Sequence, residues 1–323
     1  MRVPRGFRFS GVPSGVKPQR RDLALLVSDV PAAAAGVFTV NRAAAAPVLD
    51  ARDRVPAEGM RAIVGNAGNA NALTGPAGLA DVAAVRAAAA QALGVQKRAI
   101  LTASTGVIGQ RLPVHKIELA LPQAVEQLGD HAELCAEALM TTDTRPKMTA
   151  REVVLGGKSA ILTAVCKGSG MIAPQMATTL CFVATDAAVK PEVLQETLRR
   201  AVRNTFHMVT VDGDMSTNDT VYVLANGLAG NPRIAGPGPD LEVFEAALAD
   251  LCGEMARAVA MDGEGATKLV EVVVAGAPSE EAARDCAFAI ANSPLVKSAF
   301  FGADPNWGRV LSTVGARAGS RGW

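Results

Sequence analysis

Histidines, aromatic residues and an excess of charge of either sign are scarce in this sequence. Its 323 residues include three histidines, at positions 115, 131 and 207, and no HExxH motif, so no metal site is expected. Aromatic residues are 4% of the chain, and 32 basic residues nearly balance 31 acidic ones. A nucleic-acid surface needs stacking side chains or a basic footprint, so no nucleic-acid partner is expected either.

Paired cysteines and long apolar runs are absent as well. Five cysteines are scattered along the chain and no two form a CxxC, which is typical of reduced thiols in a cytosolic protein. The apolar run Leu23–Val27 is shorter than the roughly 7–15 residues that a secretory signal needs. No stretch approaches the roughly 18 apolar residues of a membrane span. We therefore expect a cytoplasmic protein with no membrane partner.

The sequence does contain a mixture of short apolar segments and alanine-rich segments with helical periodicity. Hydrophobic residues are 49% of the chain and charged residues 20%, as in an ordinary globular protein. Because strand-like and helix-like segments mix without strict βαβ order, the sequence predicts an α+β fold. The expected elements are helices over 78–93, 114–140 (two), 191–206 and 240–260, a hairpin around Gly156–Gly157 and a strand over 268–276.

Four polar segments could line a site, and each also has an ordinary structural interpretation. The Thr-Gly turn of STGVIG (104–109) could present the backbone N–H groups of an oxyanion hole, although most such turns are only turns. Lys167 follows an apolar strand and either lies in solvent or points at a substrate carboxylate. The Gly/Asn-rich segment 64–75 either forms a turn or lines a site. Segment 211–221 lacks the glycine and glutamate of a calcium-binding EF-hand, which leaves a polar cluster that caps a helix or lines a cleft.

Two adjacent threonines in PQMATTL, Thr178 and Thr179, raise the possibility of a nucleophile. The sequence has no GxSxG elbow and few histidines, so histidine is not the expected base of an acyl-transfer reaction. An N-terminal threonine carries its own base, because its α-amine has a reference pKa of about 7.7–8.0. An internal threonine reaches that state only if the preceding peptide bond is cut, and the small Ala177 leaves room for such an attack. Both threonines could equally be ordinary strand residues.

A set of motifs spread along the chain carries a more specific signal. They read KGSGMIAPQMATTLCFVATDA, TVDGDMSTNDTV, STGVIG, TTDTRPK, DGEGATKLVEV and GADPNWGR. Together they resemble the bifunctional ornithine acetyltransferase/N-acetylglutamate synthase family of arginine biosynthesis, and the resemblance covers essentially the whole chain. It implies a layered α/β/β/α-type sandwich, as in the N-terminal-nucleophile aminopeptidases.

The resemblance implies that the precursor cuts itself between Ala177 and Thr178. The products would be an α chain, 1–177, and a β chain, 178–323, which the family assembles as a heterotetramer of two α and two β chains. Thr178 would accept the acetyl group of N-acetylornithine and pass it to glutamate. No cofactor is needed because the acetyl-enzyme conserves the acyl bond, and members that also start the pathway use acetyl-CoA as a donor substrate.

The resemblance also implies roles for individual positions. Lys167 would bind a substrate carboxylate, and Glu264 would pair with an amine of the substrate or of Thr178. The implied oxyanion hole is Thr105 and Gly106, and the implied substrate-binding positions are Thr141, Lys167, Thr178 and Glu264.

The chain departs from the family pattern at its C-terminal end. The family continues beyond DPNWGR with a tail that contributes an Asn and a Thr to the substrate site, whereas this sequence ends at Trp323. We therefore expect a C-terminally truncated chain with exposed apolar surface. Two alternatives to the transferase stay open: an aminopeptidase that passes the acyl group to water, and an inactive truncated remnant.

Overall fold

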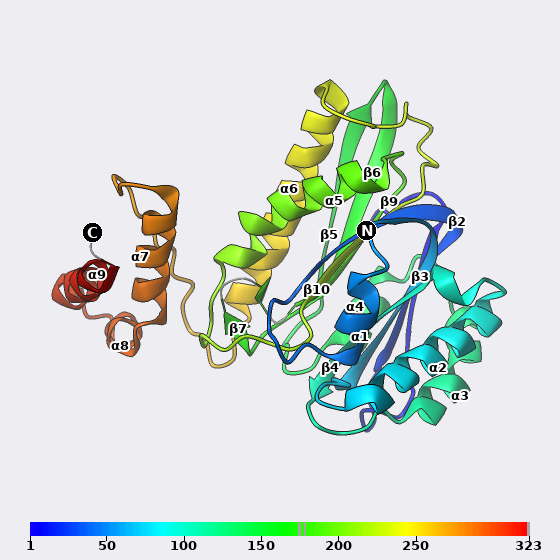
Figure 1. Ribbon diagram of the computed structural model, residues 1–323, viewed down its shortest axis with the longest axis horizontal. Coiled ribbons are helices and arrows are strands. Elements are labelled where there is room, and N and C mark those ends of the chain that lie inside the picture. The colour runs from blue at the N-terminus through cyan, green and yellow to red at the C-terminus, as the bar shows by residue number, and fades with distance from the viewer. Residues whose placement is uncertain (174–175, 178, 322–323) are drawn as a thin grey trace.

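The computed structural model describes residues 1–173, 176–177 and 179–321 (Figure 1). The strands are β1 (Phe7–Val12), β2 (Leu23–Phe38), β3 (Ala57–Asn69), β4 (Ile100–Val107), β5 (Lys147–Leu155), β6 (Lys158–Lys167), β7 (Ile172–Ala173), β8 (Met176–Ala177), β9 (Leu180–Thr185) and β10 (Thr220–Ala225). The helices are α1 (Ala46–Arg52), α2 (Gly75–Leu93), α3 (Val114–Glu126), α4 (Ala132–Leu139), α5 (Pro191–Arg203), α6 (Pro239–Met261), α7 (Glu280–Asn292), α8 (Pro294–Phe301) and α9 (Trp307–Arg321), with 3-10 turns η1 (Lys97–Ala99) and η2 (Phe206–Met208).

Strand β2 joins the two halves of the main sheet. It pairs with β3 along one side, and along the other side first with β1 and then with β10, all antiparallel. The register between β2 and β3 shifts between Val27 and Ala34, and such irregularities bend a strand. In the described residues the path of hydrogen-bonded strands is β4-β3-β2-β10-β9-β6-β5, and only β3–β4 and β9–β10 are parallel. The mixed sheet confirms the predicted α+β class.

The two outer faces of the sheet are covered by helices on opposite sides of the molecule (Figure 1). Helices α2 and α3 pack on β2, β3 and β4, where Leu25 and Val64 meet Val85 of α2. On the other side α5 packs mainly on β2 and α6 mainly on β5 and β6, and Val183 of β9 lies in the same hydrophobic cluster as Leu198 of α5. The predicted helices over 78–93, 191–206 and 240–260, and the two within 114–140, are all confirmed.

The inner faces of the two sheet halves share a core of their own. Leu26 and Ile63 from one half pack in the same cluster as Phe182 and Tyr222 from the other, because alternate residues of each strand point to opposite faces. The Tyr222 hydroxyl donates to the Thr102 carbonyl of β4 at 3.1 Å, which ties β10 to the opposite half. The order of layers is therefore helices, sheet, sheet, helices, as expected for an α/β/β/α sandwich.

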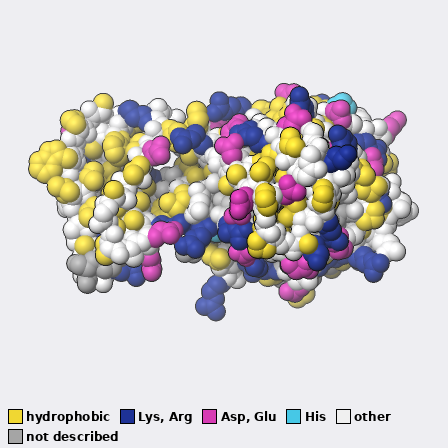
Figure 2. All heavy atoms as spheres, turned by 90° about the horizontal axis from the view of Figure 1, so that it is seen from above, with side chains coloured by type: hydrophobic (Ala, Val, Ile, Leu, Met, Phe, Trp, Pro, Cys, Tyr) yellow, Lys and Arg dark blue, Asp and Glu magenta, His cyan; other side chains and the backbone are white. Residues whose placement is uncertain are grey.

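The C-terminal helices α7, α8 and α9 pack mainly on one another and extend away from the sandwich (Figure 1). Phe301, Trp307 and Leu311 are 71%, 74% and 60% exposed, and apolar side chains gather at this end of the molecule (Figure 2). The strand predicted over 268–276 is wrong, because residues 266–275 have no regular secondary structure in the part of the chain described. An alternating apolar pattern forms a strand only where a partner strand is available. None of the described helices is both long and apolar enough to cross a membrane.

Helix α4 lies between the sheet halves, and its contact with β1 allows no side chain at Gly11. A Cβ atom on Gly11 would lie 1.9 Å from the Leu134 carbonyl oxygen. We expect Gly11→Ala to lower the free energy of unfolding by at least about 1–3 kcal/mol, because α4 must move. Gly236→Ala is the matched control, since a Cβ there meets no atom within 4 Å. Urea unfolding of both variants makes the test, and equal stability would contradict this packing.

Candidate active site

The predicted nucleophile, Thr178, lies outside the described residues, so the site is built from its neighbours. Thr179 is 1% exposed, and its carbonyl oxygen accepts a hydrogen bond from the Thr220 amide at 2.8 Å. The next residue, Leu180, is paired with Lys167 of β6 on one side and Thr220 of β10 on the other. The start of β9 is therefore held between the end of β6 and the start of β10.

Lys167 is buried at this end of the sheet. Its side chain is 2% exposed, which excludes the interpretation as a solvated lysine. Burial lowers the pKa of Lys167 below its ordinary value of 10.5, while the nearby Asp143 carboxylate acts in the opposite direction. The Lys167 Nζ atom lies 4.0 Å from Oδ2 of Asp143. A buried ammonium group beside the start of β9 is suited to bind an anion.

Thr105 and Gly106, predicted to form a turn, lie instead within the end of strand β4, where they pair with Ala67 and Gly68 of β3. The side-chain amide of Asn218 donates to the carbonyl oxygens of Ser104 at 2.7 Å and Ala70 at 2.6 Å. Because Asn218 lies two residues before Thr220, it connects this end of β4 to the start of β10. Gly106 has a φ of +132°, and a Cβ there would lie 2.3 Å from the Gly68 backbone, so only glycine fits.

The Gly/Asn-rich segment 64–75 serves mainly to hold the end of β4 in place. Asn66 Oδ1 accepts a hydrogen bond from the Ser104 hydroxyl at 2.6 Å. The Asn69 amide donates to the carbonyl oxygens at 110 and 111, and the Asn71 amide donates to that of Gly78. The described contacts of these side chains favour the structural interpretation of the segment.

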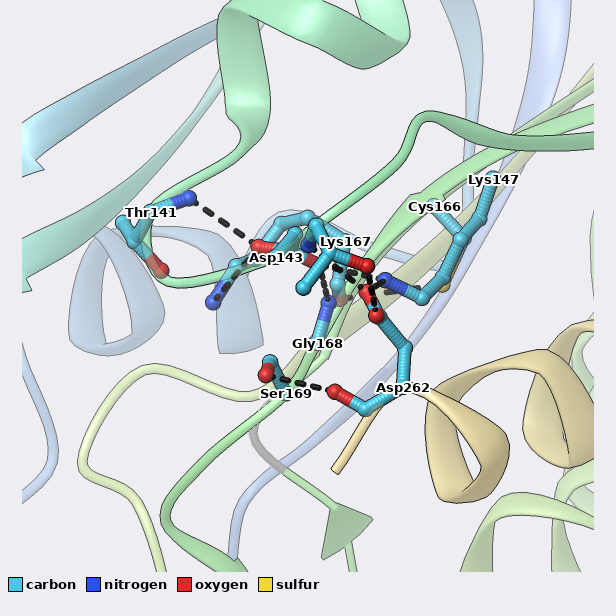
Figure 3. Close-up of polar contacts among 9 residues, drawn as sticks. Thr141, Asp143, Lys147, Cys166, Lys167, Gly168, Ser169 and Asp262 are labelled. Atoms are coloured by element: carbon cyan, nitrogen blue, oxygen red, sulfur yellow. Dashed lines mark hydrogen bonds and ion pairs between the residues drawn. The ribbon is translucent and has the colours of Figure 1, made fainter. Parts of the chain in front are cut away.

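Thr141 and Glu264 are both linked to the segment that follows Lys167, Thr141 through Asp143 (Figure 3) and Glu264 through a direct backbone hydrogen bond. The Thr141 amide donates to Asp143 Oδ2 at 3.0 Å. The Glu264 amide donates to the Ser169 carbonyl at 2.9 Å, and its exposed carboxylate lies over the Gly170 backbone, 2.3 Å from where a Cβ would stand. The structure thus brings Thr141, Lys167 and Glu264 together. These positions agree with the expected substrate site, although their roles stay predictions.

Sequence reasoning missed several charged groups around these residues, of which Asp219 is buried. Asp219 is fully buried, and burial raises the pKa of its carboxyl well above the ordinary value. Lys17 Nζ donates to the Met140 carbonyl at 2.7 Å, next to Thr141. Asp212 accepts hydrogen bonds from the amides of residues 171 and 172, which shows one use for the polar cluster 211–221. No sequence pattern pointed to the buried pair of Asp143 and Lys147, because an i,i+4 spacing brings side chains together on a helix, whereas Asp143 lies in a loop and Lys147 begins β5.

Comparison with known proteins matches residues 8–321 to the ArgJ family. The arginine biosynthesis bifunctional protein ArgJ of Geobacter sulfurreducens is 47% identical over 313 residues, which are 96% of this chain and 80% of the relative. The chain belongs to the ArgJ family. The ArgJ protein of Thermosynechococcus vestitus is 49% identical over 98% of this chain and 76% of its own length. The family resemblance drawn from the motifs is confirmed.

Solved ArgJ structures share part of this fold. The crystal structure of ArgJ from Bacillus halodurans is 36% identical and superposes with a TM-score of 0.50. The match covers 53% of this chain and 91% of that chain.

Within the described residues, no group of three or more His, Cys, Asp and Glu side chains could hold a metal ion.

A substitution of Asn218 tests whether its hydrogen bonds hold the end of β4 in place. Asn218→Ala leaves the buried carbonyl groups of Ala70 and Ser104 without a donor, so we expect a loss of at least about 2 kcal/mol in the free energy of unfolding. Asn204→Ala is the control, because Asn204 is exposed. Thermal and urea unfolding of the two variants measure the difference. If Asn218→Ala is as stable as Asn204→Ala, these hydrogen bonds do not hold the end of β4.

Proposed function

We propose that this chain transfers the acetyl group of N-acetylornithine to glutamate through an acetyl-Thr178 intermediate, giving ornithine and N-acetylglutamate in arginine biosynthesis. Membership of the ArgJ family supports the pathway, because the relative from Geobacter sulfurreducens is named an arginine biosynthesis bifunctional protein. The observation that carries the proposal is the convergence of Lys167, Thr141 and the end of β4 at Thr105–Gly106 near the start of β9. Position 178 lies two residues before that start in the sequence.

Self-cleavage comes first in the proposed sequence. The Thr178 hydroxyl attacks the Ala177 carbonyl carbon, so an ester bond forms while the peptide C–N bond breaks and the nitrogen takes a proton. Water then hydrolyses the ester, which leaves a carboxylate at Ala177 and a free α-amine on Thr178. Ala177 is paired with Ile172 in the β7–β8 hairpin, and the Ile172 amide is bound by Asp212. These contacts support a fixed backbone on the amino side of the cut.

Acetyl transfer follows with the new α-amine as base. The amine takes the hydroxyl proton of Thr178, and the oxygen attacks the acetyl carbonyl of N-acetylornithine. Thr105 and Gly106 stabilise the oxyanion, and the protonated α-amine gives its proton to the departing amine of ornithine as the amide C–N bond breaks. The amine of glutamate then attacks the acetyl ester, its proton passes through the α-amine to the Thr178 oxygen, and the ester C–O bond breaks to restore the hydroxyl group. Lys167 binds the substrate carboxylate and Glu264 pairs with an amine. In this proposal acetyl-CoA is an alternative donor substrate and not a bound cofactor.

The division into an α chain, 1–177, and a β chain, 178–323, is part of the proposal. The match to the Bacillus halodurans structure covers about half of this chain but nine tenths of the solved chain. The solved chain is therefore little more than half as long as this chain. The proposed α chain is likewise little more than half of the 323 residues. After the cut, β9 would still be paired with β6 and β10. We propose a cytoplasmic enzyme that assembles as two α and two β chains.

The variant Thr178→Ala tests whether the Thr178 hydroxyl group carries out both self-cleavage and acetyl transfer. We expect the wild-type chain to give fragments 1–177 and 178–323 on a denaturing gel, and to move the acetyl group from N-acetylornithine to labelled glutamate. Thr178→Ala should stay intact and transfer nothing, because both steps need its hydroxyl group. Thr179→Val, which keeps the shape of the neighbouring residue, should still be cut. A wild-type chain that stays whole would refute self-cleavage, and peptide hydrolysis without acetyl exchange would favour the aminopeptidase alternative.

The lowered pKa of Lys167 predicts an alkaline limit for substrate binding. Because burial lowers this pKa, the ammonium group loses its proton at a pH below 10.5, and the affinity for a carboxylate falls there. We expect kcat/KM for N-acetylornithine to decrease on the alkaline side, chiefly through a rising KM. The variant Lys167→Met should no longer show this alkaline decrease in kcat/KM. The variant Lys190→Met, which changes a lysine at an exposed helix end, should still show it. An unchanged alkaline limb in Lys167→Met would refute this role.

A further inference from the structure

Asp143 is a fully buried carboxylate that contacts two of the expected substrate-binding positions (Figure 3). Its Oδ1 atom accepts hydrogen bonds from Lys147 Nζ and from the Gly168 amide, both at 2.7 Å. Its Oδ2 atom accepts the Thr141 amide at 3.0 Å and lies 4.0 Å from Lys167 Nζ. One side chain therefore joins the loop that carries Thr141 to the end of β6.

The contacts of Asp143 continue through Lys147 to a third position. Lys147 Nζ lies 2.5 Å from Oδ2 of Asp262, which also accepts the Thr144 amide at 3.0 Å. The Ser169 hydroxyl donates to the Asp262 carbonyl at 2.6 Å. Ser169 in turn accepts the Glu264 amide. The backbone at Glu264 thus belongs to the same network as Asp143.

The two lysines beside Asp143 are held in different ways. Lys147, 1% exposed, is bonded at short range to two carboxylates, so its charge is matched within the protein. Lys167 stands at 4.0 Å from Asp143, close enough for attraction but beyond hydrogen-bond distance. Burial alone would raise the pKa of Asp143, but Lys167 and Lys147 outweigh burial and hold it below the ordinary value. Asp143 is therefore ionised at neutral pH, while Lys167 keeps capacity for a second anion.

We propose that Asp143 is the positioning residue of the substrate site: it orients the Lys167 ammonium group, and through Thr141 and Gly168 the surrounding backbone, toward the carboxylate of the amino-acid substrate. The inference rests on the proposed function. It assigns Asp143 no contact with the reacting atoms. A carboxylate that served stability alone would act equally on substrates with and without a carboxylate group.

Asp143→Asn keeps the shape of the side chain and removes its charge. The donor substrates are N-acetylornithine and N-acetylputrescine, which is the same donor without the carboxylate. We expect Asp143→Asn to lower kcat/KM for N-acetylornithine by about tenfold or more, mainly through KM, and to change the value for N-acetylputrescine by less than about threefold. The matched control is Asp81→Asn, which breaks the ion pair between Asp81 of α2 and Arg111. It should change kcat/KM for neither donor.

A second measurement does not depend on activity. In protein labelled with ¹³C at the lysine ε-carbon, the NMR titration of Lys167, assigned with Lys167→Met, should move to lower pH in Asp143→Asn. If Asp143→Asn does not fold, the triple variant Asp143→Asn/Lys147→Met/Asp262→Asn removes all three charges of the buried group and should show the same loss of selectivity.

The outcomes separate this inference from the proposed function. Equal losses for both donors, or an unchanged Lys167 titration, in a protein whose wild type transfers acetyl would overturn the positioning role and leave the function standing. A wild-type chain that neither transfers acetyl nor gains thermal stability from N-acetylornithine would refute the proposed function, and the positioning role would fall with it.

Discussion

The pairing of β9 between β6 and β10 is the constraint on which the candidate site depends. Leu180 is opposite Lys167 in one ladder and Thr220 in the other, so the start of β9 lies where β6 ends and β10 begins. A strand that is bonded on both sides keeps its place even when the chain before it is interrupted. A new chain end could therefore be formed at position 178 without disturbing the groups that surround it.

The second requirement is that the two halves of the sheet stay closed on each other. Thr105 and Gly106 belong to β4 in one half, whereas Lys167 belongs to β6 in the other. The shared inner core, helix α4 and the Asn218 amide bring these halves together. Chemistry at this place is thus a property of the closed sandwich and not of any single loop. The low-dielectric interior also makes each buried charge dependent on its partner.

The sequence predicted features that depend on local pattern and missed those that depend on distant pairing. The helices over 78–93 and 191–206 and the hairpin at Gly156–Gly157 follow from periodicity and turn residues, and all are present. The strand over 268–276 required a partner that no local pattern reveals. The motifs identified Thr141, Lys167 and Glu264, which do lie together. The burial of Lys167 and the link from Asp143 to Asp262 could not be read from the sequence, because residues more than a hundred positions apart create them.

The unpaired segment 266–275 has a consequence for the behaviour of the chain in solution. Leu269, Val270 and Val273 are 43%, 43% and 79% exposed, and Glu271 is the one charged residue between Leu269 and Ala275. A β-prone stretch with little charge and no proline resembles the cores of amyloid-like assemblies. Among the described residues the backbone of 267–275 has no hydrogen-bond partner, so it can template strands from other copies. We therefore expect this segment to be a site of self-association.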